Sequence, residues 1–182
     1  TAIAGINDPL ARKIAVWALA DGAPDSMSFF EADSARRDLA GWPKAQGRQA
    51  AAEKLLETSN LPPQKIVDWF GGGEPATAQG AMALAAALKA TGYELQARAL
   101  IQRWWTTKLF EVEQQTAMRN RFGGYLSETE NSARADLLMW GPQGPAAQEL
   151  AATLTGPDKA LAEARMALRS GRSDALALVA AL

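Results

Sequence analysis

The sequence predicts an all-α protein, built as a superhelical array of short antiparallel helix pairs, an α-solenoid, with about ten or eleven helices. Alanine, leucine, glutamine, glutamate, lysine and arginine dominate the chain, and these residues favour helices. The alternation of β-branched and aromatic residues that marks strands is nearly missing. The 15 glycines and 9 prolines separate short apolar runs, and no long heptad seam favours a four-helix bundle. No linker divides the 182 residues, so we expect one domain over residues 1–182.

The first helix is expected to begin at Pro9. Asp8 precedes this proline as an N-cap precedes an N1 proline, and the Asp21-Gly22 pair ends the run. Apolar residues between these limits lie at helical spacing: Leu10, Ile14 and Trp17. Ser26 is the expected N-cap of a second helix, which carries the Phe29-Phe30 pair.

Prolines also mark the next two helices. Pro43 opens a third helix that continues through Leu56, and Pro62-Pro63 starts a short fourth helix. The apolar face of this fourth helix consists of Ile66, Val67, Trp69 and Phe70. The glycines at 71–73 then end it. Because no Gly-Lys-Ser/Thr follows them and no strand precedes them, we expect a flexible turn here and not a phosphate-binding loop.

A helical hairpin is predicted in the middle of the chain. One helix runs from Thr77 to Thr91, Gly92 occupies a position that needs positive φ, and a second helix returns from Tyr93 to Thr106. Alanines stand where the two helices would touch, as in tetratricopeptide-like solenoids. A similar pattern returns in "ALAEARMALRSGRSDALALVAAL" at 160–182. Further helices are expected around Val112 to Arg121, Ser127 to Trp140 and Pro145 to Leu154.

Composition excludes several classes of function. The net charge is −1, from 19 basic and 20 acidic residues that are well mixed, so nucleic acid is not an expected partner. Cysteine and histidine are absent, which rules out thiolate and imidazole chemistry in this chain. We expect no metal site, no cofactor and no catalytic residue. No apolar run is long enough to predict a transmembrane segment.

The adjacent pair Trp104 and Trp105 follows Arg103 in a predicted helix. Neighbouring residues on a helix point about 100° apart, so the two rings cannot occupy one pocket. Core packing is the commoner role for such large side chains, and a stacking platform for a sugar or a peptide is the alternative. The three residues Arg103, Trp104 and Trp105 are therefore the candidates for a glycan or partner surface.

Acidic side chains are candidates for general acids, because glycoside cleavage needs a protonated carboxyl close to the scissile bond. The candidates are Glu111 with Glu113, Glu128 with Glu130, and Asp136. Residues two apart on a helix face different ways, so solvated or capping roles are expected for these acids. "SETE" at 127–130 predicts a capping box, with Ser127 as N-cap and Glu130 as its partner. For Arg134 we expect either a surface position or pairing with a neighbouring helix's carboxylate or terminal carbonyls.

The stretch "LIQRWWTTKLFEVEQQTAMRNRFGGYLSETENSARADLLMWGPQGPAAQEL" at 100–150 resembles the helical segment of soluble lytic murein transglycosylases, especially those of α-proteobacterial type. The matching positions are Arg103, Trp105, Phe110, Arg121, Phe122, Gly123, Leu126, Ser127, Glu130, Arg134, Asp136, Leu138 and Trp140. Met139 replaces a leucine of the family pattern, and Asn131 stands where many relatives have histidine. Three further stretches resemble the family in the same order: "DPLARKIAVW", "GWPKAQGRQAAAEKLL" and "ALAEARMALRSG".

The resemblance implies a periplasmic location and a part in cutting peptidoglycan glycan strands with formation of 1,6-anhydromuramic acid. In that family a superhelical α-domain precedes a lysozyme-like domain that carries the catalytic glutamate in a Glu-Ser motif. No Glu-Ser pair occurs in these 182 residues, so the chain is expected to be the non-catalytic helical portion and inactive alone. Its implied partners are the missing C-terminal catalytic domain and, through the full-length enzyme, glycan strands. The alternative is a tetratricopeptide-like module that binds a protein or peptide and has no connection with cell-wall cleavage.

Overall fold

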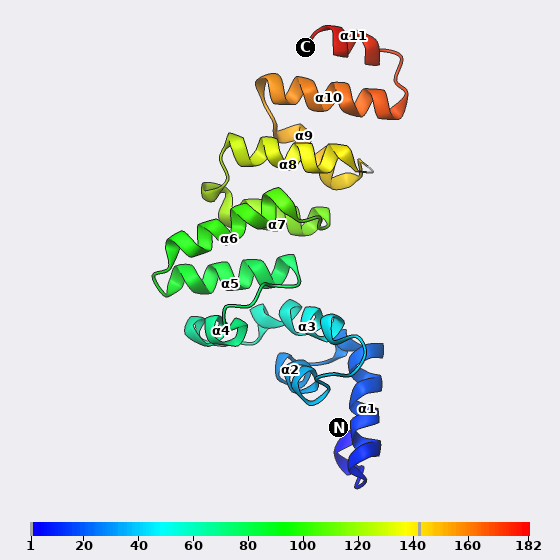
Figure 1. The fold of residues 1–182 in the computed structure, drawn as a ribbon, viewed down its shortest axis with the longest axis vertical. Coiled ribbons are helices and arrows are strands. Elements are labelled where there is room, and N and C mark those ends of the chain that lie inside the picture. Colours follow the sequence, from blue (N-terminus) through cyan, green and yellow to red (C-terminus); the bar gives the residue numbers. More distant parts are fainter. Residues whose placement is uncertain (1, 142) are drawn as a thin grey trace. The chain divides into compact units, whose positions relative to one another are not determined.

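The computed structural model describes residues 2–141 and 143–182 and confirms the predicted all-α class. Over these residues it contains eleven α-helices, four short 3₁₀ turns and no strand (Figure 1). Several pairs of neighbouring helices in the chain pack together, as expected for an array of short helices. The chain forms two compact units, unit 1 up to Ala97 and unit 2 from Arg98 onward. The expectation of a single domain over residues 1–182 stays a prediction.

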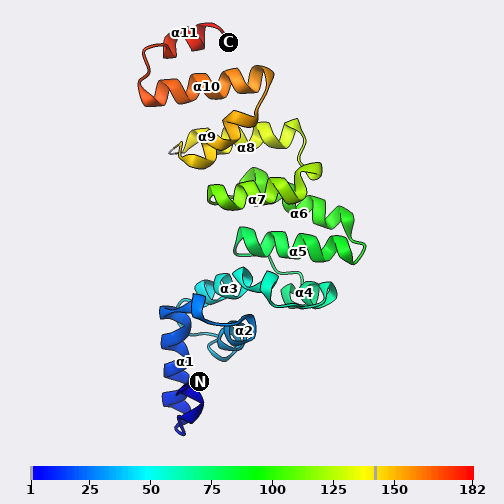
Figure 2. The same ribbon diagram turned by 180° about the vertical axis from the view of Figure 1, so that it is seen from behind.

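Unit 1 contains five complete α-helices and the start of a sixth. Their bounds are α1 Pro9–Gly22, α2 Phe29–Asp38, α3 Ala45–Lys54, α4 Pro63–Phe70, α5 Ala78–Ala90 and α6 Glu94–Thr107, with 3₁₀ turns η1 Ala2–Gly5, η2 Pro24–Ser26 and η3 Leu56–Thr58. α2 packs on α1 and α3, and both α3 and α4 pack against α5 (Figures 1 and 2). Small side chains at these contacts let the helices approach closely; they include Ala32, Ala35, Ala52, Ala81 and Ala85.

Several predicted helix ends are confirmed. Asp8 caps α1 by accepting a hydrogen bond from the Ala11 amide at 2.7 Å, and Pro9 is its first residue. Gly71 ends α4 in the left-handed conformation at φ 54°. Gly92, at φ 88°, makes the turn between α5 and α6.

Two predicted helix starts are wrong. Residues Pro24–Ser26 form the 3₁₀ turn η2, so the N-cap of α2 is Ser28 instead of Ser26. α3 begins at Ala45 instead of Pro43. Lys44 precedes it in the left-handed conformation at φ 63°, and the Pro43 carbonyl accepts a hydrogen bond from Arg48 at 2.6 Å. In both cases the residues before the helix form a turn whose backbone groups have hydrogen-bond partners outside the helix, so the helix begins two residues later than predicted.

A buried arginine joins α3 to the end of α2. Arg48 donates hydrogen bonds to three backbone carbonyls in the segment that follows α2: Leu39, Trp42 and Pro43. It also pairs with Asp21 of α1 at 3.0 Å. Carbonyls at a helix end lack partners within the helix, so Arg48 satisfies groups that burial would otherwise leave unpaired.

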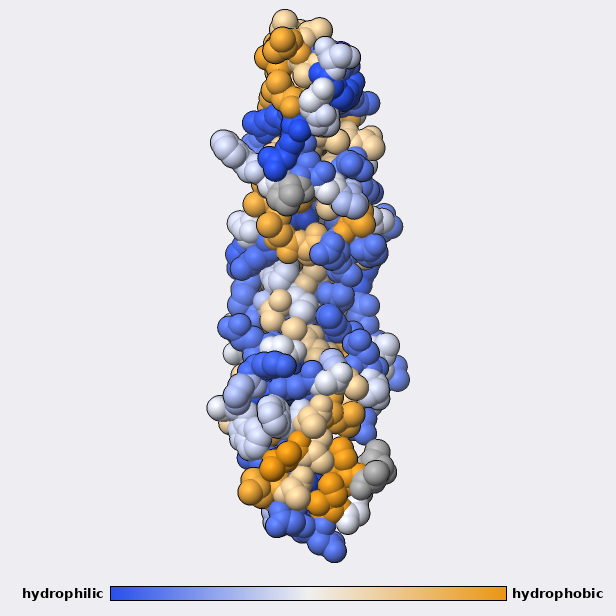
Figure 3. Space-filling view, turned by 90° about the vertical axis from the view of Figure 1, so that its right-hand side faces the viewer, coloured by the Kyte–Doolittle hydropathy of each residue, from blue (hydrophilic) through white to orange (hydrophobic). Residues whose placement is uncertain are grey.

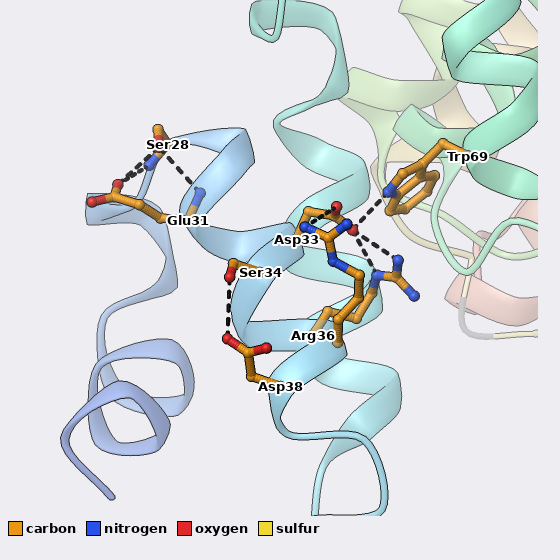
Figure 4. A network of polar contacts seen from close by, with 8 residues as sticks. Ser28, Glu31, Asp33, Ser34, Arg36, Asp38 and Trp69 are labelled. Carbon is orange, nitrogen blue, oxygen red and sulfur yellow. Dashed lines mark hydrogen bonds and ion pairs between the residues drawn. The ribbon is translucent and has the colours of Figure 1, made fainter. Parts of the chain in front are cut away.

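A second polar network connects α2 with α4 (Figure 4). The Asp33 carboxylate, largely buried, accepts hydrogen bonds from the Trp69 indole at 2.7 Å and from Arg36 at 2.7 Å. The Arg36 guanidinium lies over the Trp69 ring, 5.0 Å from its centroid. Trp69 also contacts Phe29, which orients the predicted aromatic face of α4 toward α2. In Figure 4 these groups point toward one another from the two helices.

The apolar stripe predicted for α1 divides between core and surface. Trp17 packs against Trp42, with ring centroids 5.7 Å apart. Leu10 and Ile14 are exposed. Figure 3 shows apolar side chains, in orange, gathered at the α1 end of unit 1. Part of this helix therefore lacks a partner within unit 1.

Unit 2 also consists of short helices. After α6 its elements are α7 Val112–Phe122, η4 Gly123–Tyr125, α8 Glu128–Trp140, α9 Pro145–Thr153, α10 Gly156–Ser170 and α11 Ala175–Ala180. α8, α9 and α10 pack mutually, α7 packs on α9, and α11 packs on α10. In Figure 3 apolar side chains also gather at the α10–α11 end of this unit. Of the helices in the described residues, none is both long and apolar enough to cross a membrane.

Candidate binding surface

The predicted surface residues Arg103, Trp104 and Trp105 lie in α6 within unit 2. Both indole rings are buried, with 4% of Trp104 and 0% of Trp105 exposed, whereas Arg103 is exposed. Phe110 lies beside both rings, at centroid distances of 6.4 Å and 6.5 Å. This burial favours the core-packing interpretation of the tryptophan pair over a stacking platform. Binding of a glycan or partner by this stretch stays a prediction.

Arg134 is the centre of the polar core of unit 2. It is fully buried in α8, so the surface alternative for this residue is wrong, and pairing with the terminal carbonyls of a neighbouring helix is confirmed. Its Nη1 donates to the carbonyls of Trp105 at 3.0 Å and Lys108 at 2.6 Å, at the end of α6. The guanidinium lies 4.0 Å from the ring centroid of Phe110 and 5.1 Å from that of Trp105. Desolvation lowers the pKa of Arg134 to about 10, with Glu149 acting in the opposite direction, so the group stays charged at neutral pH.

Gln115 of α7 extends this network to α9. The amide is fully buried; its oxygen accepts from Arg134 Nε at 2.9 Å. Its nitrogen donates to the Ala146 carbonyl at 2.8 Å and to the Glu149 carboxylate at 2.6 Å. Arg119 of α7 also pairs with Glu149. The network therefore fixes α8 against α6, α7 and α9 through groups that are costly to leave unpaired.

The predicted capping box at the start of α8 is confirmed. The Ser127 hydroxyl and amide both donate to the Glu130 carboxylate, and the Thr129 amide donates to the Ser127 oxygen at 3.2 Å. The hydrogen bond from the Ser127 side chain, followed by that from its backbone, lowers the pKa of Glu130. Gln102 of α6 also donates to Glu130, at 3.3 Å.

The other acids considered from the sequence do not come together. Glu111, Glu113 and Glu128 are exposed at helix starts. Asp136 is exposed on α8 and pairs with Arg165 of α10. No group of three or more acidic side chains suited to a metal ion occurs within the described residues.

The same packing leaves an open pocket between α8 and α10, on the surface of unit 2. Its volume is about 400 Å³, and its lining residues are Met139, Trp140, Gln143, Arg165, Leu168 and Arg169. Trp140 is 83% exposed and Leu168 52% exposed, although both are large and apolar. Exposed apolar residues that cluster in a concave surface are typical of binding sites.

Sequence reasoning missed this pocket. In the sequence Trp140 belongs to the motif shared with the transglycosylase family, and neither Arg165 nor Arg169 is a predicted site residue. The sequence contains one pattern that indicates this surface. Arg165, Leu168 and Arg169 lie at positions i, i+3 and i+4 of one helix and therefore share a face. The pairing of that face with Trp140 depends on how α10 packs on α8, which no local pattern gives.

No family model, no curated protein and no solved structure matches the chain.

Proposed function

We propose that the chain is the non-catalytic helical scaffold of a periplasmic peptidoglycan lytic transglycosylase. Cleavage of the glycan strand, with formation of 1,6-anhydromuramic acid, is assigned to a C-terminal lysozyme-like domain outside these 182 residues. The scaffold holds that domain and presents it to the glycan strand. The proposal originates in the ordered set of motifs that resemble this family.

The observation that carries the proposal is that separate motif residues form one connected assembly. Trp105, Phe110 and Arg134 stack on one another, although 29 positions separate the first from the last. Ser127 and Glu130 form the cap that starts the same helix. Chance matches scattered along a chain have no reason to meet in space, so this convergence supports a shared helical architecture.

The test compares three purified samples on isolated sacculi: the natural full-length protein, the 182-residue chain, and the downstream portion. Chromatography of the soluble products should show 1,6-anhydro muropeptides with the full-length protein and with the downstream portion. The 182-residue chain alone should release none. Release by this chain alone, or a natural downstream sequence without a lysozyme-like Glu-Ser segment, contradicts the proposal.

A further inference from the structure

We propose that the α8–α10 pocket binds the free C-terminal carboxylate of a peptide whose last residue is apolar. This inference does not rest on the proposed function, because it is argued from the lining of the pocket alone. Three features of the pocket support the proposed peptide ligand: an exposed apolar wall, two guanidiniums, and few polar side chains that could bind the hydroxyls of a sugar.

The apolar wall consists of Trp140 at the end of α8 and Leu168 on α10, above the buried side chain of Met139. Covering this wall removes apolar surface from water, which favours binding of an aliphatic or aromatic side chain. The Arg134 network holds the helix that carries Trp140, so the wall is formed before a ligand arrives.

The charged side of the pocket consists of Arg165 and Arg169, one helical turn apart on α10. Asp136 pairs with Arg165 from α8. No hydrogen bond or ion pair joins the exposed Arg169 guanidinium to another described residue, and no acid lines the pocket. The pocket therefore carries a net positive charge next to an apolar wall. A guanidinium presents parallel N–H donors that match the two oxygens of a carboxylate.

The lining favours a peptide end over a saccharide. A sugar ring presents several hydroxyls that need donors and acceptors, yet among the described lining residues Gln143 has the single uncharged polar side chain. Its Nε2 already donates to the Met139 carbonyl at 3.3 Å, which leaves its oxygen to accept one backbone N–H. A volume of about 400 Å³ lies in the range of small-ligand pockets and fits the end of a chain better than a folded domain.

The experiment titrates the purified 182-residue chain with acetyl-Gly-Gly-Leu and with the same peptide amidated at its C-terminus. Calorimetry gives the affinities, and the ¹H–¹⁵N indole signal of Trp140, assigned with the Trp140→Phe variant, reports on the site. The free acid should bind saturably and shift this signal. Loss of charge-assisted hydrogen bonds should make the amide bind about 10-fold more weakly or worse.

Arg169→Ala should weaken binding of the free acid about 10-fold. Lys159→Ala is the matched control, because it removes the same charge from an exposed position on α10, about 15 Å away along the helix, and should leave the affinity unchanged. Equal affinity for acid and amide, or an unshifted Trp140 signal, overturns the proposal. A shift of that signal by N-acetylglucosamine oligomers without any response to the peptide acid also overturns it and assigns the pocket to a saccharide.

Discussion

Among the described residues, units 1 and 2 each contain one buried arginine that binds the end of a helix, and the two arginines differ in how their charge is balanced. Arg48 in unit 1 binds three carbonyls beyond α2, and Arg134 in unit 2 binds two carbonyls at the end of α6. Each arginine thereby binds backbone carbonyls that have no hydrogen-bond partner within their helix. An array of short helices has many helix ends. A long side chain with several N–H donors, such as arginine, can bind several of the carbonyls at one end.

The sites of Arg48 and Arg134 differ in how the charge of the guanidinium is compensated. Arg48 pairs directly with the Asp21 carboxylate at 3.0 Å. Arg134 contacts no carboxylate of the described residues. The neutral Gln115 lies between it and Glu149, and the rings of Phe110 and Trp105 face the guanidinium. Aromatic faces and an amide dipole can therefore take the place of a counter-ion in a buried site. The difference predicts unequal responses to the same substitution.

The largest expected effect is the loss of either arginine. Arg48→Met and Arg134→Met should each lower the free energy of unfolding by about 3–5 kcal/mol, because burial of the unpaired partners is costly. Arg48→Met should cost more, since it leaves three carbonyls and the Asp21 carboxylate without their donor, whereas Arg134→Met leaves two carbonyls and one amide oxygen. Urea denaturation followed by circular dichroism measures both.

Arg169→Met is the control for this pair of variants. It removes an exposed guanidinium from α10 and should change the free energy of unfolding by less than about 0.5 kcal/mol. A cost for Arg134→Met as small as that of the control would show that the hydrogen bonds at the end of α6 are dispensable. The comparison between the two buried arginines would then fail.

A smaller effect on the free energy of unfolding is expected at the start of α5 in unit 1, where a buried glutamate, Glu53, binds backbone amides. The Glu53 carboxylate, fully buried, accepts from the backbone amides of Ala76 and Thr77 and from the Thr77 hydroxyl, at 2.7 to 2.9 Å. A Cβ at Gly80 would lie 2.3 Å from the Glu53 Oε2 atom. Gly80→Ala should therefore lower the free energy of unfolding by about 1–3 kcal/mol, although alanine is the better helix former.

Gly124→Ala is the matched substitution in unit 2. A Cβ at Gly124 meets no atom within 4 Å, and the residue does not have a positive φ. Thermal unfolding of both variants should show a loss for Gly80→Ala and almost none for Gly124→Ala. Equal melting temperatures for the two would mean that Glu53 moves aside freely and does not fix the start of α5.

Local chemistry made much of the fold predictable. The Asp8-Pro9 start, the Gly92 turn and the Ser127–Glu130 cap depend on residues within a few positions of one another, and all three are confirmed. The two misplaced helix starts, at Ser26 and Pro43, fell where a 3₁₀ turn and a bond from Arg48 replaced the usual N-terminal geometry.

Contacts between distant residues were not predictable in the same way. Arg48 meets Asp21 across 27 positions, and Gln115 meets Glu149 across 34. From the neighbouring sequence alone, an arginine or glutamine on a helix is predicted to lie at the surface, because these side chains are mostly exposed in proteins. The α8–α10 pocket was missed for the same reason, since Trp140 and Arg169 come together only when α10 packs on α8.

The smallest expected effect concerns the capping boxes, which occur in both units as Ser28–Glu31 in α2 and Ser127–Glu130 in α8. Hydrogen bonds from the serine lower the pKa of each glutamate. A carboxylate whose pKa is lower in the folded chain contributes stability above its unfolded pKa, and this contribution disappears as pH falls through the folded pKa. Ser28→Ala and Ser127→Ala should each cost about 1 kcal/mol at neutral pH.

This cost should be smaller at acidic pH than at neutral pH, because the contribution is lost as the pH falls through the lowered pKa of each glutamate. Urea denaturation at both pH values measures the difference. Ser28→Ala should show the larger pH-dependent part. Glu130 keeps a hydrogen bond from Gln102 when Ser127 is replaced, whereas among the described residues only Ser28 donates to the Glu31 carboxylate. A cost that is the same at neutral and acidic pH would mean that the serine hydroxyl acts on the backbone alone, and that the glutamate half of each box contributes nothing.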